Sequence, residues 1–327
     1  MPNFINSNCL VKNVFLPKKS QLISSKCNYL PPLKNIYNSN VEISRQKTPL
    51  NELHTCQKLS LLVDKANIEQ HYHDALLADF VYSRDFTTLE ATQWGIEREL
   101  ARFLSKKTNI KLNPQHGLLN DSKTGLVAYI FHNKIRQEIR LVFGGTTSGE
   151  AVSGGAPRYM KNPRTFINQC NANIDNVFGD IPACYKQASQ LLHHLQLLMQ
   201  HEKWEKYNLS TSGHSLGGGL AAYSALKVST TEKTIRAECF CSAQLGLGLQ
   251  KDLLAQYSNL ANLKKVKAHI NHYYVDGDII PKLDKFFAVD HIGSVNIIPQ
   301  IAEKKDSALA AHSRYVAHIR TLYQQAV

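Results

Sequence analysis

The chain has 327 residues, and 38 Lys or Arg against 26 Asp or Glu give it a formal net charge of +12. That length holds one α/β domain of about 250 residues with some chain left over, and the apolar and charged fractions are those of an ordinary soluble globular protein. No run of about 20 predominantly apolar residues occurs, which excludes a transmembrane helix. Seven irregularly spaced cysteines without a C-x-x-C pair exclude a disulfide framework and a zinc signature.

The first segment, residues 1–60, is rich in Asn, Ser, Lys and Pro and shows no sustained periodicity. We therefore expect a loosely ordered, basic polar arm. Residues 1–65 contain nine Lys or Arg and three acidic residues, which is about half of the positive excess. No cleavable secretory signal is visible, because the longest apolar run in the first twenty residues is Val14-Phe15-Leu16.

Periodicity begins near Leu59, and we expect one domain over residues 61–327. The predicted elements, in chain order, are helices over 66–83 and 87–107, strands over 126–131 and 138–143, a helix over 182–206, a strand over 209–212, a helix over 216–228, a strand over 235–241, a helix over 250–257, a strand over 266–275 and a helix over 307–325. Strands that alternate with helices indicate the α/β class, with a mainly parallel sheet and helices on both faces.

The segment 144–176 interrupts this alternation. It is polar, contains five Gly and two Pro, and has no clear periodicity. About thirty such residues inside a compact domain are typical of a functional loop, so we predict a lid over residues 147–176.

Gly213-His214-Ser215-Leu216-Gly217 fits the G-x-S-x-G nucleophile elbow. It lies between a predicted strand and a predicted helix, where a sharp turn projects the serine hydroxyl above the sheet edge and glycines keep side chains out of the bend. Ser215 is therefore the predicted nucleophile, and the amide of Leu216 would donate to a developing oxyanion at the helix N-terminus. The alternative is a glycine-rich turn that holds an unreactive serine.

An acid and then a histidine follow the nucleophile in the chain order of α/β-hydrolases. Asp276 and Asp278 both follow the predicted strand over 266–275, at the sheet edge where catalytic residues gather. His291 and His312 both come later in the chain. Chain order alone leaves the choice within each pair open.

Several motifs carry a family resemblance. The string Thr211-Ser212-Gly213-His214-Ser215-Leu216-Gly217-Gly218-Gly219-Leu220-Ala221 resembles the T-G-H-S-L-G-G-A-L-A elbow of the class 3 lipases. Leu141–Ser148 is similar to the family's F-R-G-T/S oxyanion segment, and Gly277–Leu283 is similar to its D-I/V-V-P-R-L segment. His291-Ile292-Gly293 resembles the H-V-G that follows, and His312-Ser313-Arg314-Tyr315 resembles the final H-S-x-x-Y. The likeness spans roughly residues 65–325.

The resemblance implies an α/β-hydrolase fold and an ester-hydrolysing site. It implies that Asp278 is the acid, that His312 is the base, and that His291 is structural. It also implies that Thr146 supplies the second oxyanion donor, opposite the amide of Leu216. The family's usual Arg before the oxyanion glycine is Gly144 here, so the usual salt-bridge support of that loop is not expected.

We expect a serine esterase of the phospholipase type that releases fatty acid from glycerophospholipids through an acyl-enzyme. It would act peripherally on a phospholipid membrane surface, anionic lipid included. Arg158, Lys161 and Arg164 of the predicted lid suit phosphate head groups. The alternatives are a lipase or carboxylesterase for neutral esters, and a catalytically inactive lipase-like protein that binds lipid or a partner.

No cofactor, metal or nucleic acid is expected. Neither the His71/His73 pair nor the His193/His194 pair shares a helix face, and no nucleic-acid-binding motif occurs. Unpaired cysteines, no cleavable signal and a membrane-degrading activity favour a protein secreted through a specialised bacterial export system into a recipient cell. A resident cytoplasmic lipase is the alternative. The arm over residues 1–60 would then serve delivery or membrane targeting and be dispensable for catalysis.

Overall fold

The computed structural model describes residues 65–146, 148, 163–201, 203–257, 260–280, 291–300 and 306–326. All of them lie in the second of the chain's two units, Pro49–Val327. The predicted arm over residues 1–60 lies outside the described residues, and so does most of the first half of the predicted lid.

A nine-stranded sheet forms the centre of the described structure, with the order β2-β3-β4-β5-β6-β7-β8-β9 and β1 paired to β4. The strands are β1 (Gly95–Ile96), β2 (Lys111–Asn113), β3 (Leu118–Asp121), β4 (Leu126–Asn133), β5 (Glu138–Phe143), β6 (Asn208–His214), β7 (Arg236–Phe240), β8 (Ile270–Val275) and β9 (Ser294–Ile298). Strands β1 to β5 pair antiparallel, whereas β5 to β9 are all parallel. The predicted parallel sheet is therefore confirmed for the five strands that carry the predicted site.

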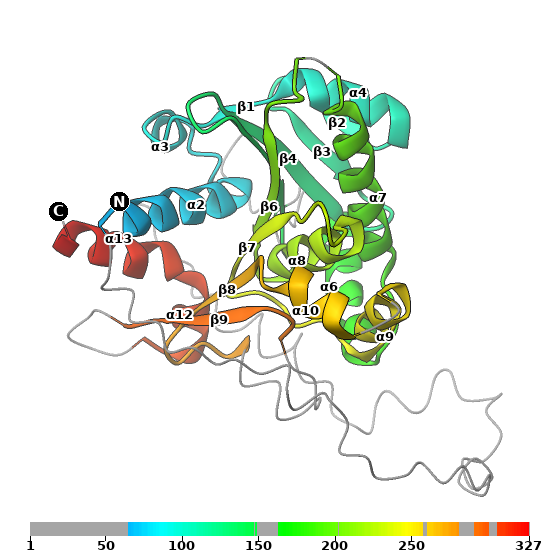
Figure 1. Cartoon of the computed structure of the whole chain (residues 1–327). Helices are drawn as coiled ribbons and strands as arrows, with labels where there is room; N and C mark the ends of the chain where they lie inside the picture. Colours follow the sequence, from blue (N-terminus) through cyan, green and yellow to red (C-terminus); the bar gives the residue numbers. More distant parts are fainter. Residues whose placement is uncertain are drawn as a thin grey trace, which may run out of the picture. The chain divides into compact units, whose positions relative to one another are not determined.

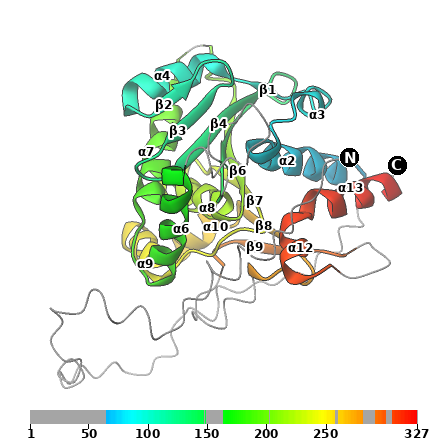
Figure 2. The ribbon, with the colours of Figure 1, turned by 180° about the vertical axis from the view of Figure 1, so that it is seen from behind.

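Helices cover both faces of this sheet, as the alternation of elements predicts (Figures 1 and 2). One face carries α2 (Lys65–Ser83) and α13 (Tyr315–Ala326), which pack against each other. The other face carries α7 (Ala183–Leu198) and α8 (Leu216–Val228), with α4 (Arg98–Thr108), α9 (Leu247–Gln256) and α10 (Leu260–Lys267) around them. The arrangement is that of an α/β-hydrolase, with polar side chains following the ends of β6 and β8.

Apolar side chains fill both spaces between the helices and the sheet. On the α8 side, strand residues such as Leu141 and Cys239 are fully buried in one cluster with helix residues such as Leu220 and Leu192. On the other side, Phe80 of α2 packs on aromatic residues of β4, with its ring centroid 5.3 Å from that of Tyr129. The same face continues towards α13 through a further apolar cluster.

The predicted helix over 87–107 is wrong. The chain instead forms α3 (Phe86–Glu90), then β1, then α4. The helix starts are set by carboxylates that accept hydrogen bonds from backbone amides: Asp85 caps α3 and Glu97 caps α4. The pairing of β1 with β4 interrupts the helical pattern between the two caps.

The polar segment before α7 contains a helix that its sequence pattern did not predict. Pro163–Val177 forms α6, and its buried positions are Thr165, Gln169, Ala172 and Asn176. These positions have helical spacing but are mostly polar. Gln169 donates to the carbonyl of Gly125 at 3.0 Å and Asn176 donates to that of Gln244 at 2.7 Å. Hydrogen bonds anchor the inner face of the helix, so hydrophobic periodicity could not reveal it.

Other boundaries differ from prediction where the elements are short. Strands β2, β3 and β9 have too few residues to show a pattern. The predicted strand over 266–275 is wrong at its start, because helix α10 continues to Lys267 and β8 begins at Ile270. The predicted helix over 307–325 is divided into α12 (Ala308–Ser313) and α13, with Arg314 as the C-cap of α12, and α7 ends at Leu198 rather than near Lys206. None of the described helices combines the length and apolar character needed to cross a bilayer.

Candidate active site

Ser215 occupies the turn between β6 and α8. Its backbone has φ 57° and ψ −126°, a conformation that is rare for a residue with a side chain. A Cβ on Gly213 would collide with the backbone of Gly217, and a Cβ on Gly217 would collide with the backbone of Phe143. Both glycines are therefore required sterically, and the strand-serine-helix context predicted for an elbow is present.

Three predicted residues meet at this turn. His312 Nε2 lies 3.1 Å from Ser215 Oγ, and His312 Nδ1 lies 3.2 Å and 3.4 Å from the two carboxylate oxygens of Asp278. Ser215 and His312 are partly exposed, whereas Asp278 is 2% exposed. This is the hydrogen-bond chain that an acid-base-nucleophile triad requires.

Asp278 is held as an anion in a buried position just beyond the end of β8. Burial alone would raise the pKa of Asp278. The hydrogen bond and charge interaction with His312 outweigh burial, together with the amide of Ile280 and the thiol of Cys241, so the pKa is lowered. The Ile280 amide donates to Asp278 Oδ1 at 3.0 Å.

A second histidine, His214, holds the backbone of His312. Its Nε2 lies 2.9 Å from the carbonyl oxygen of His312, and its ring stacks on Tyr315 with centroids 4.6 Å apart. Burial, followed by the nearby His312, lowers the pKa of His214 to about 3. The ring is therefore neutral at ordinary pH, and because a carbonyl only accepts, its proton is on Nε2.

The alternative acid and base lie elsewhere. Asp276 is exposed, and its backbone amide donates to the carbonyl of Ile298. His291 is buried, with its Nε2 2.7 Å from the hydroxyl of Tyr274 and 3.3 Å from Gln244 Nε2. His312 is the histidine that contacts Ser215 among the described residues.

The loop after β5, which carries Thr146, is tied to α2. The Gly145 amide donates to Tyr82 Oη at 3.0 Å, and the Tyr82 hydroxyl lies 3.2 Å from both the carbonyl oxygen and Nδ1 of His214. Thus one tyrosine connects the loop to the residue that precedes the nucleophile.

Arg84 supports the same loop from the segment after α2. Its Nη2 donates to the carbonyl of Ser148 at 2.7 Å. A side chain at Gly144 would collide with Ser148, which explains why an Arg is absent there. An arginine therefore supports this loop, but it comes from the segment after α2. The resemblance would place it at position 144, within the loop itself.

Thr146 itself is positioned from the helix in the predicted lid. Asn173 Nδ2 of α6 donates to Thr146 Oγ1 at 3.1 Å. Leu216 is the first residue of α8, where helix amides point toward the turn. The loop and the helix start approach each other at Gly145, where a Cβ would meet the amide of Gly217.

Tyr82, Arg84 and His214 were not predicted from the sequence as parts of this site. Tyr82 and His214 are 132 residues apart, and no local pattern connects them. The one sequence signal for His214 was its place next to Ser215 in the G-x-S-x-G motif.

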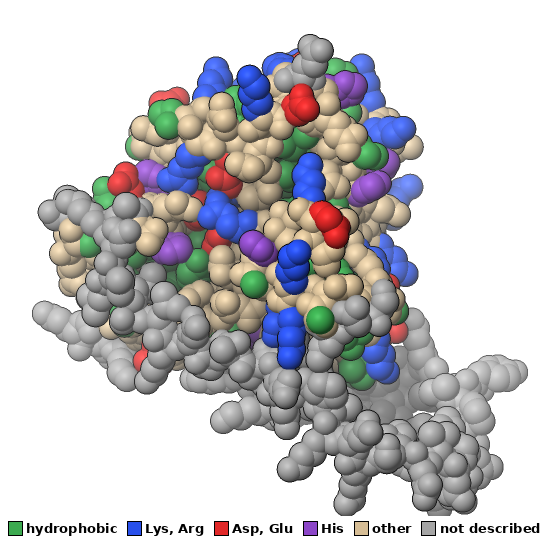
Figure 3. Space-filling view, viewed as in Figure 1, with side chains coloured by type: hydrophobic (Ala, Val, Ile, Leu, Met, Phe, Trp, Pro, Cys, Tyr) green, Lys and Arg blue, Asp and Glu red, His purple; other side chains and the backbone are tan. Residues whose placement is uncertain are grey.

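Apolar and basic side chains are both exposed near the described part of the predicted lid. Ile167, Ile174 and Val177 of α6 and the neighbouring Phe178 are 54%, 45%, 40% and 75% exposed, and Arg164 is also exposed. Elsewhere, Lys and Arg side chains are spread over the visible face, with hydrophobic side chains among them (Figure 3).

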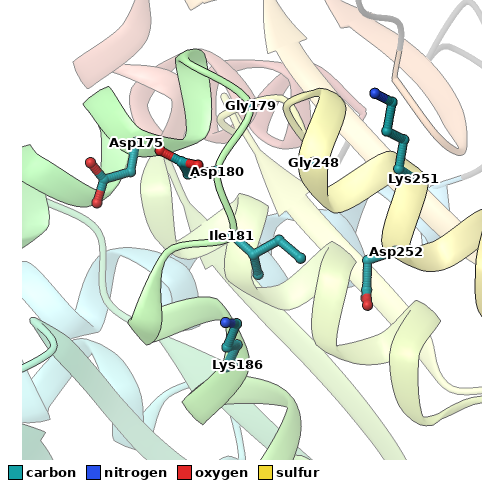
Figure 4. Close-up of a pocket in the computed structure, with 8 residues that line it drawn as sticks. All are labelled: Asp175, Gly179, Asp180, Ile181, Lys186, Gly248, Lys251 and Asp252. Atoms are coloured by element: carbon teal, nitrogen blue, oxygen red, sulfur yellow. The ribbon is translucent and has the colours of Figure 1, made fainter. Parts of the chain in front are cut away.

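A separate hollow of about 790 Å³ lies between the α6–α7 connection and α9. Its lining residues are labelled in Figure 4: Asp175, Gly179, Asp180, Ile181, Lys186, Gly248, Lys251 and Asp252. None of these lining residues belongs to the Ser215 group.

Two groups of described residues have the spacing of metal ligands. Ligand atoms of His214, Cys241 and His312 lie within 4.8 Å of one another. Both nitrogens of His312 already contact Ser215 and Asp278, so this group has no open position. The second group, His71, Asp74 and Glu238, lies on α2 and β7 and shares no residue with the triad.

Comparisons with known proteins identify the family. A family model described as phospholipase-like, a Tle-like phospholipase domain, matches residues 73–325. No curated protein matches. Similar solved structures include a mutant form of MDLA from Penicillium cyclopium (15% identity, 76% of this chain and 85% of that chain, TM-score 0.44), the Rhizomucor miehei lipase propeptide complex (14%, 78% and 77%, 0.41) and a triacylglycerol lipase from Penicillium expansum (13%, 72% and 81%, 0.40).

Proposed function

The chain belongs to the Tle-like phospholipase domain family and is a lipid-ester hydrolase, and on that premise we propose that it is a serine phospholipase. The observation that carries the proposal is the hydrogen-bond chain from Ser215 Oγ through His312 to Asp278, at a turn whose glycines permit the conformation of an elbow. The predicted site and the family agree on the same bond type, an acyl ester.

In the proposed mechanism, Ser215 Oγ attacks the acyl carbonyl of a glycerophospholipid while His312 Nε2 takes the hydroxyl proton. Asp278 orients the imidazole and stabilises its cation. The amides of Leu216 and Thr146 would stabilise the tetrahedral oxyanion. His312 then returns the proton to the departing glycerol oxygen, which releases a lysophospholipid. Water, activated by His312, hydrolyses the acyl-enzyme and frees the fatty acid.

We favour phospholipid over neutral lipid because charge and apolar surface occur together on helix α6 and on Phe178 directly after it. Exposed Arg164 suits a phosphate head group, and exposed Ile167, Ile174 and Phe178 suit the acyl layer below it. The other two lid cations, Arg158 and Lys161, lie outside the described residues. A lipase or carboxylesterase for neutral esters is the alternative activity.

The proposed setting is a membrane surface in a recipient cell. The Tle-like family is associated with secreted bacterial effectors. We extend this to the chain itself: it would leave its producing cell through a specialised export system and bind phospholipid peripherally. The described cysteines Cys170, Cys184, Cys239 and Cys241 are free thiols, which suits action in a reducing compartment.

Two measurements test the proposal. A fluorophosphonate probe should label the wild type and Ser313→Ala, whose exposed serine is next to His312, but not Ser215→Ala. On phosphatidylcholine/phosphatidylglycerol liposomes, Ser215→Ala should lower the rate of fatty acid release by about 10⁴-fold or more. Labelling of folded Ser215→Ala at the wild-type rate would overturn the serine mechanism. Equal wild-type rates on liposomes and on triacylglycerol emulsion would favour the neutral-lipid alternative.

The choice of base has its own test. His312→Ala should abolish probe labelling, whereas His291→Ala should retain it if folded, because His291 contacts Tyr274 and Gln244 rather than Ser215. Far-UV circular dichroism checks the fold of each variant. The reverse ranking in two folded variants would show that His312 is not the base.

A further inference from the structure

His71, Asp74 and Glu238 bring one ligand atom each to within 4.8 Å of the other two. His71 and Asp74 are three residues apart on α2 and so share a helix face, and Glu238 faces them from β7. Glu238 is 164 positions beyond Asp74 in the chain, where no spacing rule could connect it. The pair that local spacing suggests, His71 and His73, lies on two different faces of the helix.

Each of the three residues has a buried atom without a hydrogen-bond partner. These atoms are His71 Nδ1, Asp74 Oδ2 and Glu238 Oε2. The Tyr273 hydroxyl also reaches this group and interacts with the Glu238 carboxylate. The side chains of Asp74 and Glu238 belong to residues that are 0% and 1% exposed. A native protein rarely leaves three such atoms together unsatisfied, because each costs about 1–3 kcal/mol.

The remaining oxygens of the two carboxylates are already bound and therefore fix their orientation. Arg140 Nη1 donates to Asp74 Oδ1. Asn271 Nδ2 donates to Glu238 Oε1 at 3.2 Å, and Arg236 Nη1 lies 3.4 Å from the same atom. Outer hydrogen bonds of this kind orient the ligands of metal sites.

The charges around the three residues do not balance. The carboxylates of Asp74, Glu138 and Glu238 contact two cations, Arg140 and Arg236. With all three carboxylates ionised, one negative charge is left over in a buried place, where a cation or a proton must balance it.

We propose that His71, Asp74 and Glu238 bind a divalent cation of the zinc type and thereby fasten α2 to β7. One imidazole nitrogen and two carboxylate oxygens, with water in the fourth position, form a set that Zn²⁺ accepts. Ca²⁺ and Mg²⁺ prefer oxygen ligands alone and fit it less well. The cation would neutralise the surplus charge. Because the C-terminal end of α2 carries Tyr82, which holds the loop of Thr146, the cation would stabilise the same helix that supports the predicted active site.

The test is isothermal titration of the chelator-treated full-length protein with ZnCl₂. His71→Phe keeps an aromatic ring, which packs on Tyr273 with centroids 5.0 Å apart, but removes the ligand nitrogen. His73→Phe is the matched control on the same helix. We expect a one-to-one site in the wild type and in His73→Phe. In His71→Phe the affinity should fall by more than about 100-fold, because loss of an outer-shell partner alone already costs 10- to 100-fold.

Co²⁺ as a substitute probe identifies the ligands. A tetrahedral spectrum without a thiolate charge-transfer band is expected, and it should be lost in His71→Phe. Equal Zn²⁺ affinity in folded His71→Phe and wild type would overturn the proposal, as would a thiolate band or the absence of any site in the wild type. The absence of a site would mean that a proton, rather than a metal, balances the three carboxylates. These binding readouts do not depend on the proposed phospholipase activity.

Discussion

Replacing His214 by Phe should reduce catalysis without touching any of the three proposed catalytic side chains. The neutral ring of His214 donates from Nε2 to the carbonyl oxygen of His312 at 2.9 Å and thereby fixes the end of α12. Phe keeps the aromatic ring that stacks on Tyr315 but removes the donor, together with the Nδ1 that lies 3.2 Å from the Tyr82 hydroxyl. The Tyr82 hydroxyl keeps the carbonyl oxygen of residue 214 as an acceptor at the same distance. His312 should then sample positions away from Ser215 and Asp278.

The size of the effect follows from that hydrogen bond. A buried carbonyl left without its donor costs about 1–3 kcal/mol, which corresponds to roughly a 5- to 150-fold loss if it is expressed entirely in positioning. A misplacement of about 1 Å in a catalytic group can itself cost about 10²-fold. We therefore expect kcat for a soluble p-nitrophenyl ester to fall by about 10- to 100-fold, with a smaller change in KM.

Two variants distinguish positioning from general damage. Tyr315→Phe keeps the stacked ring and loses only a long hydrogen bond of 3.4 Å to the carbonyl of Ala75, so it should retain near-wild-type activity. His214→Gln, whose amide can donate to the same carbonyl, should recover part of kcat. The pH profile of kcat should keep its shape in His214→Phe, because a group with a pKa of about 3 is uncharged across the assay range. A folded His214→Phe protein with wild-type kcat would refute the reasoning.

Four further outcomes are expected. Asp278→Asn should lower kcat by about 10⁴-fold, because the histidine loses its orienting anion, while exposed Asp276→Asn should stay close to wild type in the same ester assay; the opposite ranking would exchange their roles. Arg84→Ala should lower kcat more than KM, because Ser148 loses the guanidinium that holds the Thr146 loop, and an unchanged kcat in the folded variant would remove Arg84 from that role. Stability measured by urea unfolding should fall as the pH drops below 6.5, because His214 and His272 have pKa values lowered by burial to about 3 and about 4, so the unfolded chain takes up protons that the native state excludes. The slope should approach about 1.4 kcal/mol per pH unit for each histidine, and a flat stability between pH 6.5 and 4 would contradict it. Hydrolysis of anionic liposomes should weaken as NaCl rises, because screening over about 8 Å at physiological ionic strength reduces the attraction of a +12 chain; a rate independent of salt would speak against charge-driven membrane binding.

The local sequence pattern was sufficient to predict the nucleophile elbow at Ser215. Strand β6, Ser215 and helix α8 have the order and nearly the bounds that the sequence predicts, because a short strand, a glycine-flanked turn and an alanine- and leucine-rich helix are each determined by neighbouring residues. The same holds for β4, β5 and α2, whose patterns are long enough to be unambiguous.

Contacts between residues far apart in the chain determine the elements that the sequence pattern failed to predict. Gly95–Ile96 becomes a strand only because β4 offers it an edge, and that pairing divides the helix predicted over 87–107. The buried face of helix α6 could not be recognised from the sequence, because Gln169 and Asn176 bury amide groups there rather than aliphatic groups. Hydrophobic periodicity detects burial by the apolar contacts that a helix makes and is silent where hydrogen bonds take their place.

For the site, the sequence by itself determined which residue types occur and in which order: a serine at an elbow, two acids after a strand and two later histidines. It could not choose between Asp276 and Asp278 without a family resemblance, because both follow β8 and differ only in the direction that the turn gives each side chain. The fold decided that Asp278 faces His312 while Asp276 is exposed. It also decided the contacts of His214 with His312 and of Tyr82 with Gly145, since hydrogen bonds act between neighbours in space, and residues 98 and 63 positions apart become neighbours only when the sheet has formed.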